Sequence, residues 1–263
     1  MFPIKLGQFL KYAQERLKPS YDAEADAVWI AEECLSLTRS RVRTQLMREL
    51  TAEEEASLMS ALEKRAAGEP VQYIFGRAPF MGYEFFVDRR VLIPRMDTEN
   101  LCEAAYNYIN RKKGAKVLDL CAGSGCVGLA LAANVPNARV VLGDISEGAL
   151  RICRQNVRRN GLSGRVVPMR VNALEKPNVN LGEFHCIVSN PPYIPSADIP
   201  GLDSSVLDFE PHLALDGGED GMEFYCAITQ MWKDALLPGG RLYYEVGIGQ
   251  ADTVLRIMRA VAQ

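Results

Sequence analysis

The stretch KVLDLCAGSGCVG, residues 116–128, decides how this chain folds. Its first five residues are mostly apolar and predict a buried strand, and Gly123, Gly125 and Gly128 follow closely. Glycine lets the backbone turn sharply and approach a ligand, and the residues after Gly125 have helical composition. The stretch therefore predicts a strand, a ligand-binding turn and a helix, which together form one unit of an α/β sheet.

Short apolar segments alternate with helical segments along the rest of this half of the chain. The further expected strands are residues 139–143, 165–171, 184–189 and 241–246, and the expected helices are residues 97–110, 126–134, 147–160, 222–235 and 250–262. This alternation is typical of parallel strands covered by helices on both faces. We therefore expect a doubly wound, Rossmann-like α/β domain over residues 96–263, with ligands at the carboxyl ends of its strands.

The residues before this domain have a different pattern. Residues 1–70 carry apolar stripes at helical spacing, Pro19–Ser20 interrupts them, and Thr51-x-x-Glu54 is the signature of a capped helix start. Residues 71–95 are rich in aromatic and β-branched side chains and punctuated by glycine and proline, which predicts a β-hairpin. We expect a small N-terminal helical bundle and a β-hairpin connector ahead of the α/β domain.

Composition argues against several classes of protein. The chain is 48% hydrophobic and 24% charged, like an ordinary globular protein, and has no apolar run near the roughly 20 residues that span a bilayer. Its net charge of −3 argues against non-specific binding to nucleic acid. Seven cysteines without Cys-x-x-Cys spacing predict free thiols in the cytoplasm. We expect no metal site, because His185 and His212 lack partners at ligand spacing.

The glycine-rich turn and two acids define a candidate cofactor site. Gly123-x-Gly125-x-x-Gly128 also matches the dinucleotide fingerprint, so the glycines alone leave a nicotinamide cofactor, S-adenosylmethionine and a plain tight turn as alternatives. Asp144 ends the next strand about 20 residues after Gly125, where an acid binds ribose hydroxyls. Asp119 suits the ammonium group of S-adenosylmethionine and would repel a pyrophosphate. Its alternative role is to bind the helix N-terminus.

Other cofactor contacts follow from the ends of neighbouring strands. Asn172 or the backbone of Ala173 would meet the adenine edge, and Ile145 would cover one adenine face. The alternative for Asn172 is that it caps a turn. The cofactor residues expected from this pattern are Asp119, Cys121, Ala122, Gly123, Ser124, Gly125, Asp144, Ile145, Asn172 and Ala173.

The catalytic candidate is Asn190-Pro191-Pro192-Tyr193, directly after an expected strand. Its two prolines remove two backbone donors, which leaves outward carbonyls without competing N–H groups. An NH2 group offers two donors; the Asn190 oxygen and the Pro191 carbonyl are the expected acceptors, and Tyr193 would stack on the planar group. The alternative is a rigid loop. Because hydride transfer needs no such site, the motif favours S-adenosylmethionine and methylation of an amide or amine nitrogen.

These motifs resemble the HemK/PrmC protein-(glutamine-N5) methyltransferases, which act on peptide chain release factors. The resemblance covers nearly the whole chain. Besides the glycine-rich turn and Asn190–Ile194, it is carried by Gln72–Gly76, Leu92–Glu99, Phe209–Pro211, Leu213–Leu215, Gly218–Gly221 and Leu237–Gly247. It implies a class I methyltransferase fold, S-adenosylmethionine as cofactor, and as substrate the glutamine of the Gly-Gly-Gln motif in class I release factors. The N-terminal bundle and the connector would help to dock that protein.

The resemblance also implies roles for single residues. Asn190 falls on a cofactor position of the family, as do Gly123, Gly125, Asp144 and Ala173. Asn190-Pro191-Pro192-Tyr193 falls on the glutamine-binding motif. Arg95 and Thr98 lie in a family segment near the cofactor, although Arg95 would equally suit a structural ion pair. The family implies a cytoplasmic protein of translation termination, and we expect a monomer without direct nucleic-acid contacts.

Two other substrates stay open. One is a glutamine of a ribosomal protein, and the other is adenine N6 or guanine N2 of a nucleic acid. Acidic residues near the expected site argue against the second, namely Glu210, Asp216, Glu219 and Asp220.

Two features depart from the family. Met96 stands where the family usually has proline, and the chain stops at Gln263, where the family usually continues with an antiparallel hairpin. We therefore expect the strand at residues 241–246 to be an exposed sheet edge, and we interpret the chain as shortened.

Overall fold

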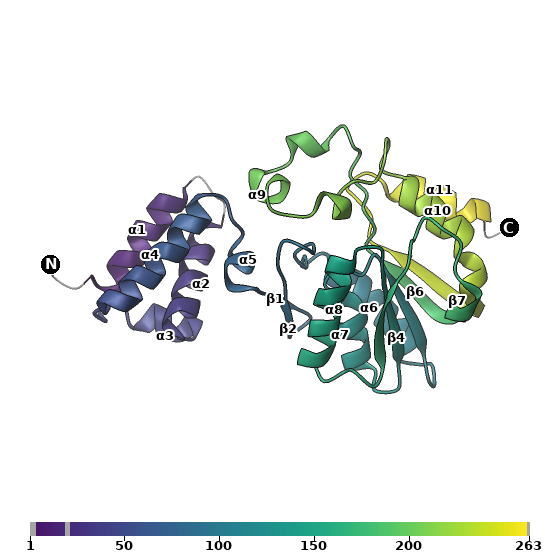
Figure 1. Cartoon of the computed structure of the whole chain (residues 1–263), viewed down its shortest axis with the longest axis horizontal. Coiled ribbons are helices and arrows are strands. Elements are labelled where there is room, and N and C mark those ends of the chain that lie inside the picture. Colours follow the sequence, from purple (N-terminus) through teal and green to yellow (C-terminus); the bar gives the residue numbers. More distant parts are fainter. Residues whose placement is uncertain (1–3, 19–21, 262–263) are drawn as a thin grey trace. The chain divides into compact units, whose positions relative to one another are not determined.

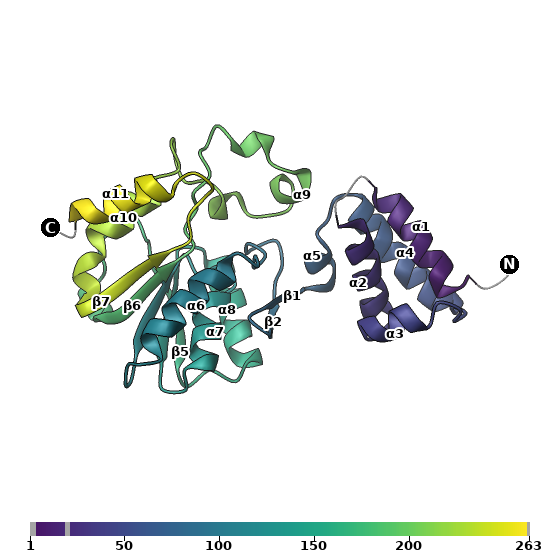
Figure 2. The same ribbon diagram turned by 180° about the vertical axis from the view of Figure 1, so that it is seen from behind.

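The computed structural model describes residues 4–18 and 22–261. The chain divides into two units, Met1–Gly76 and Arg77–Gln263, and the ribbon diagrams show the elements of each (Figures 1 and 2). The predicted helix break at Pro19–Ser20 and the last residue of the final predicted helix, Ala262, lie outside the described residues. None of the described helices is long and apolar enough to cross a membrane.

The first unit is built of helices. They are α1 (Leu6–Leu17), α2 (Ala23–Leu35), α3 (Arg39–Thr44), α4 (Ala52–Ala66) and α5 (Val71–Phe75). Buried apolar side chains from each of them meet in one core. The capping box expected at Thr51 is present, because its hydroxyl accepts the N–H of Glu54 and the Glu54 carboxylate accepts the N–H of Thr51. A largely buried ion pair between Asp26 and Arg65 joins α2 to α4.

The start of the predicted hairpin connector is helical. Val71–Phe75 forms α5, with Pro70 at its N-cap and Gly76 closing it at a φ of 68°. The aromatic and β-branched side chains that favoured a strand instead pack into the core of the helical unit. The hairpin itself is short and consists of β1 (Arg77–Phe80) and β2 (Tyr83–Phe86), paired antiparallel.

The second unit contains the predicted parallel sheet. Its strands are β3 (Lys116–Leu120), β4 (Arg139–Asp144), β5 (Val166–Arg170), β6 (Phe184–Ser189) and β7 (Leu236–Tyr244). Their order is β5-β4-β3-β6-β7, and every neighbouring pair is parallel. The chain moves outward from β3 to β5 and then returns to the other side of β3. The switch point therefore lies between β3 and β6, where doubly wound sheets bind ligands.

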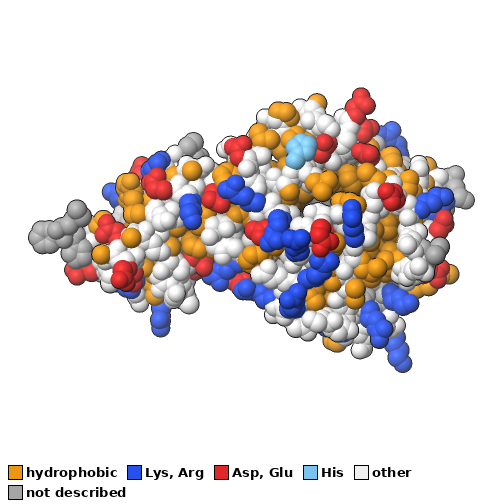
Figure 3. Space-filling model, in the orientation of Figure 1, with side chains coloured by type: hydrophobic (Ala, Val, Ile, Leu, Met, Phe, Trp, Pro, Cys, Tyr) orange, Lys and Arg blue, Asp and Glu red, His pale blue; other side chains and the backbone are white. Residues whose placement is uncertain are grey.

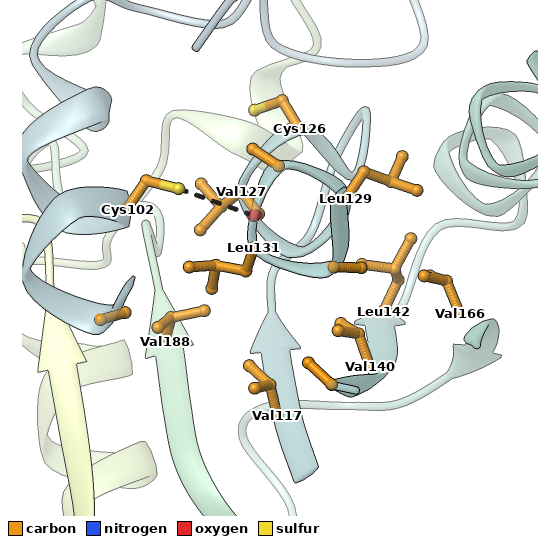
Figure 4. Close-up of a cluster of buried hydrophobic side chains, with 14 of the residues drawn as sticks. Cys102, Val117, Cys126, Val127, Leu129, Leu131, Val140, Leu142, Val166 and Val188 are labelled. Carbon is orange, nitrogen blue, oxygen red and sulfur yellow. Dashed lines mark hydrogen bonds between the residues drawn. The ribbon is translucent and has the colours of Figure 1, made fainter. Parts of the chain in front are cut away.

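Alternate residues of the strands face two different cores. Val117 and Val188 pack in a core with side chains of α6 (Thr98–Ile109), α7 (Cys126–Asn134) and α8 (Glu147–Arg159). Figure 4 shows this core, in which Val127 of α7 lies toward Cys102 of α6 and Leu131 points toward Val188 of β6. Leu118 and Ile187 face the opposite core, with Ile228 of α10 (Glu223–Met231). The fold is thus the expected α/β sheet covered on both faces.

The segments after β6 complete this unit. The short helix α9 (Ser204–Leu207) lies between β6 and α10, and α11 (Ala251–Val261) packs on α10. The strand β7 begins at Leu236, before the predicted start at residue 241, and its pairing with β6 shifts register between Phe184 and Cys186. Among the described residues, β7 pairs with one strand only, as expected for a sheet edge.

Gly128 lets α7 lie directly on β4. A Cβ atom at this position would lie 2.4 Å from Leu142 Cδ2 and 3.0 Å from Asp119 Oδ2. We therefore expect Gly128→Ala to lower the free energy of unfolding by about 1–3 kcal/mol, because overpacking strains a filled core. Urea unfolding measures this change.

The matched control is Gly148→Ala on α8. A Cβ there would meet nothing closer than 3.4 Å, and alanine favours a helix over glycine by about 0.5–1 kcal/mol. This variant should be at least as stable as the parent chain. If Gly128→Ala proved equally stable, the packing of α7 on β4 would not require glycine at this position.

Candidate active site

A cavity of about 330 Å³ lies in the second unit, at the carboxyl ends of β3, β4, β5 and β6. Residues that follow each of these strands form its walls, together with residues 90–95, the start of α6 and residues 211–214. Lys and Arg side chains gather on the face of this unit that carries α8 (Figure 3). Because its walls follow the carboxyl ends of four parallel strands, the cavity occupies the position at which doubly wound sheets bind ligands.

Most predicted site residues line this cavity, although they are far apart in the sequence. The predicted residues in its lining are Arg95, Thr98, Asp119, Cys121, Ala122, Gly123, Ser124, Asp144, Ile145, Asn172, Ala173, Asn190 and Pro192. Three predicted residues, Gly125, Pro191 and Tyr193, do not belong to the lining.

Asp144 holds the glycine-rich turn in place. One carboxylate oxygen accepts the N–H of Gly123 at 2.8 Å, and the other accepts the N–H of Ser146 at 2.8 Å. Burial raises the pKa of Asp144. A carboxylate has about four acceptor positions, so the backbone bonds leave capacity for a ligand. Asp144 can therefore shape the turn and still accept hydrogen bonds from a ligand.

Asp119 is almost completely buried and has two roles in the geometry. Its Oδ2 atom accepts the N–H of Gly128 at 2.8 Å, which is the helix N-terminus interaction that the sequence left as an alternative. The same side chain lines the cavity. Burial raises the pKa of Asp119 to about 7. The acid thus combines a structural bond with access to the cavity.

The end of β5 presents backbone more than side chain to a ligand. Asn172 accepts the N–H of Leu174 at 3.1 Å and donates to Glu175 at 2.9 Å, so its side chain caps the turn. The carbonyl of Ala173 accepts the indole N–H of Trp232 at 3.0 Å. Trp232 is a buried support for the site that no sequence signal distinguished from a core residue. Ile145, 37% exposed, forms part of the cavity wall.

The first residue of the catalytic candidate reaches the cavity from the end of β6. The amide nitrogen of Asn190 donates to the buried hydroxyl of Thr98 at 3.3 Å. The hydroxyl of Ser189 donates to the carbonyl of Leu120 at 2.8 Å and ties β6 to β3 just before the motif. Asn190 and Gly123 therefore lie in the walls of a single cavity.

Tyr193 is held by close backbone packing. A Cβ at Gly217 would lie 2.6 Å from the Tyr193 Cα atom, and one at Gly221 would lie 2.3 Å from its carbonyl oxygen. That carbonyl accepts a hydrogen bond from the Gln250 side chain at 2.8 Å. Burial raises the pKa of the Tyr193 hydroxyl. The end of the motif is thus fixed by residues that cannot carry larger side chains.

Arg95 forms the ion pair that the sequence left as its alternative role. Its guanidinium lies 2.5 Å from Oε1 of Glu210, whose side chain is only 2% exposed. Burial raises the pKa of Glu210, and Arg95 opposes this rise. Arg95 also lines the cavity, so it joins residues 90–95 to the segment that precedes Pro211.

Two kinds of residue at or near the cavity were not predicted from the sequence. Apolar side chains outside the predicted motifs line the cavity, among them Ile93, Leu213 and, at the start of α10, Phe224, and no periodicity distinguishes such residues from other apolar positions. Glu245 follows β7, and the register of β6 with β7 brings it beside Asn190. It lies inside the strand predicted at residues 241–246, where an acid near the carboxyl end was a signal for it.

The two cysteines in the described lining of the cavity, Cys121 and Cys126, are poor nucleophiles. Burial raises the pKa of Cys121 and of Cys126 far above the usual range, so both thiols stay protonated. Within residues 4–18 and 22–261, His, Cys, Asp and Glu side chains do not gather in a group that could hold a metal ion.

Comparisons with known families match both units. Residues 8–76 match the family described as the PrmC N-terminal domain, and residues 100–199 match the methyltransferase small domain. The chain is 41% identical to the release factor glutamine methyltransferase of Geobacter sulfurreducens over 236 residues, which cover 89% of this chain and 80% of that protein. It is 39% identical to the protein of the same name from Moorella thermoacetica, with 98% of this chain and 91% of that protein covered.

Solved structures share the fold at low sequence identity. The catalytic domain of hMettl16, solved with an RNA hairpin, has a TM-score of 0.55 and 15% identity, covering 77% of this chain and 73% of that chain. A SAM-dependent methyltransferase from Agrobacterium tumefaciens has a TM-score of 0.52 and 16% identity, covering 71% of this chain and 57% of that chain. At this identity the likeness shows the fold alone.

The buried acid Asp119 should make stability depend on pH. Between the pKa of an unfolded aspartate, about 3.9, and the value of about 7 in the folded chain, the folded state binds a proton that the unfolded state lacks. The contribution of Asp119 to stability therefore falls as pH rises through this range. Asp119→Asn removes the titration and keeps an oxygen acceptor for Gly128.

We expect the unfolding free energy of Asp119→Asn, relative to the parent chain, to rise by on the order of 2 kcal/mol from about pH 4.5 to about pH 7.5. Urea unfolding at several pH values gives this difference. Asp208→Asn, at an exposed position, is the matched control and should show little change with pH. A constant difference for Asp119→Asn would contradict the raised pKa.

Proposed function

The chain belongs to the release factor glutamine methyltransferase family, and on this premise we propose that it methylates a class I peptide chain release factor. The methyl group of S-adenosylmethionine is transferred to the side-chain amide nitrogen of the glutamine in the Gly-Gly-Gln motif. One observation carries this proposal: Asn190 and the turn at Gly123 line the same cavity. A methyl donor on the turn would thus face an amide held by Asn190.

The cavity fits S-adenosylmethionine in size and charge. Its volume of about 330 Å³ is within the range of roughly 300–1,000 Å³ for small-molecule sites. Asp144 would accept hydrogen bonds from the ribose, and the backbone of Ala173 would meet the adenine, with Ile145 against its face. Asp119 would attract the ammonium group. When bound, the cofactor supplies a methyl group on a positively charged sulfur.

The residues of the motif orient and activate the substrate amide. An amide nitrogen is a weak nucleophile because its lone pair is delocalised into the carbonyl. The Asn190 side-chain oxygen and the Pro191 carbonyl would accept its two hydrogens and raise the electron density on nitrogen. They would also hold it in line with the methyl carbon at about 3–3.5 Å. The nitrogen gains the methyl group, and one of its two protons then passes to solvent, so no general base is required.

We extend the proposal to the other parts of the chain. The helical unit would help to bind the release factor, a role supported by its match to the PrmC N-terminal domain over residues 8–76. The net charge of −3 supports activity without direct nucleic-acid contacts. We propose that the chain works as a monomer in the cytoplasm, where release factors act.

The direct test is methyl transfer from labelled S-adenosylmethionine to a purified class I release factor. We expect the label on the Gly-Gly-Gln glutamine and none on a factor whose glutamine is changed to alanine, because the acceptor nitrogen is then absent. Mass spectrometry of the peptide locates the methyl group. Label on the altered factor, on a ribosomal protein or on DNA in place of the intact factor would refute the assignment.

Asn190→Ala tests the acceptor role. Loss of an oxygen aimed at the reacting group should lower kcat at least about 100-fold, while the dissociation constant of the cofactor stays within about tenfold. Asn107→Ala, at an exposed position on α6, is the matched control and should keep full activity. Turnover that survives in Asn190→Ala would remove this residue from the mechanism.

A further inference from the structure

Glu245 is a partly buried acid that the proposed mechanism does not use. Its backbone N–H donates to the carbonyl of Ser189 at 3.0 Å, which continues the parallel pairing of Ser189 with Tyr244. This register places Glu245 beside Asn190. Glu245 does not belong to the described residues that line the cavity. It can therefore influence the substrate only through its neighbours. Its Oε2 atom is buried without a hydrogen-bond partner.

The proposed role of Asn190 requires one of two orientations of its amide. The oxygen must face the substrate, and the nitrogen must face away from it. In the structure the nitrogen donates to the Thr98 hydroxyl. A hydroxyl can donate as well as accept, so Thr98 alone would tolerate either orientation. Another group has to decide which way the amide points.

The carboxylate of Glu245 has the chemistry to make that choice. The side chains of Thr98, Asn190 and Tyr193 lie near this carboxylate and lower its pKa against the rise that burial causes. An ionised carboxylate only accepts hydrogen bonds. If the hydroxyl of Thr98 donates its single hydrogen bond to Glu245, the Thr98 oxygen can only accept from Asn190. Only the amide nitrogen of Asn190 can donate to it.

We propose that Glu245 is the positioning residue that orients the Asn190 amide, both directly and through Thr98, so that the Asn190 oxygen faces the substrate. The inference rests on the proposed function, because it gives the orientation its purpose. Glu245→Gln breaks the asymmetry, since a carboxamide can donate to Thr98. Thr98 is then free to donate to the Asn190 oxygen, and the amide can turn its NH2 group toward the substrate.

The first test is kinetic. Glu245→Gln should lower kcat about tenfold or more, with the cofactor dissociation constant within about twofold. Glu103→Gln, at an exposed position on α6, is the matched control and should match the parent chain. Thr98→Val should cause a similar loss and Thr98→Ser, which keeps the hydroxyl, only a small one. If the relay is real, so that Glu245 and Thr98 orient the same amide, the double variant Glu245→Gln with Thr98→Val loses less activity than the two single losses combined. Additive losses, or an unchanged kcat in Glu245→Gln, would overturn the proposal.

The second test follows pH. Burial raises the pKa of Glu245, with Asp97 adding to the rise, while the hydrogen bonds from Thr98, Asn190 and Tyr193 oppose it. Protonation removes the acceptor, so kcat of the parent enzyme should fall on the acid side with an apparent pKa above that of an ordinary glutamate. Glu245→Gln should lack this acid limb. A limb that persists in Glu245→Gln would count against the relay.

A readout without substrate separates this inference from the proposed function. The side-chain NH2 signals of Asn190 in ¹⁵N-labelled protein, assigned by their loss in Asn190→Ala, should shift with pH in the parent chain and not in Glu245→Gln. If the enzyme failed to methylate a release factor, the proposed function would fall, and these signals would still test the contact. If Glu245→Gln did not fold, absence of the shift in the parent chain would by itself refute the relay.

Discussion

The bond from the Gly128 N–H to the buried carboxylate of Asp119 is the contact on which the rest of the second unit depends. This bond joins the start of α7 to the end of β3. It forms only because Gly128 has no side chain to hold α7 away from β4. The glycine-rich turn between these elements is then short enough for Asp144 to reach the N–H of Gly123. These two carboxylate contacts fix the glycine-rich turn between β3 and α7 against the end of β4. They therefore shape this wall of the cavity.

The electrostatics of the cavity suit a cationic ligand. Burial raises the pKa of each acid near it, namely Asp119, Asp144, Glu210 and Glu245. Of these, only Glu210 has an arginine at salt-bridge distance among the described residues. A positively charged sulfonium with an ammonium group would relieve the repulsion among such acids, whereas a pyrophosphate would increase it. The charge pattern thus distinguishes two cofactors that the glycine spacing alone does not.

Local sequence signals predicted the sheet and much of the candidate site. The strand at residues 116–120 and the capped start of α4 follow from hydrophobic pattern and capping, which are local properties. Gly76 marked a turn, but α5 was missed because its apolar side chains are satisfied by the distant core of the helical unit. For Arg95 and Asn172 the sequence offered two roles each, and only their contacts with Glu210 and Leu174 show the structural ones. The place of Glu245 beside Asn190 follows from the register of β7 with β6, which no single segment encodes.

The glycines beside Tyr193 separate two properties of the enzyme that are often coupled. Because Gly217 and Gly221 press on the Tyr193 backbone and not on the cofactor turn, a methyl group added at either would tilt the acceptor segment while leaving the nucleoside side of the cavity intact. On the proposed function, the geometry of the Asn190–Tyr193 segment and the affinity for the methyl donor can therefore change independently, on different parts of the chain. On the proposed function, substitution of either glycine by a larger residue would yield a protein that still binds the methyl donor but no longer transfers the methyl group.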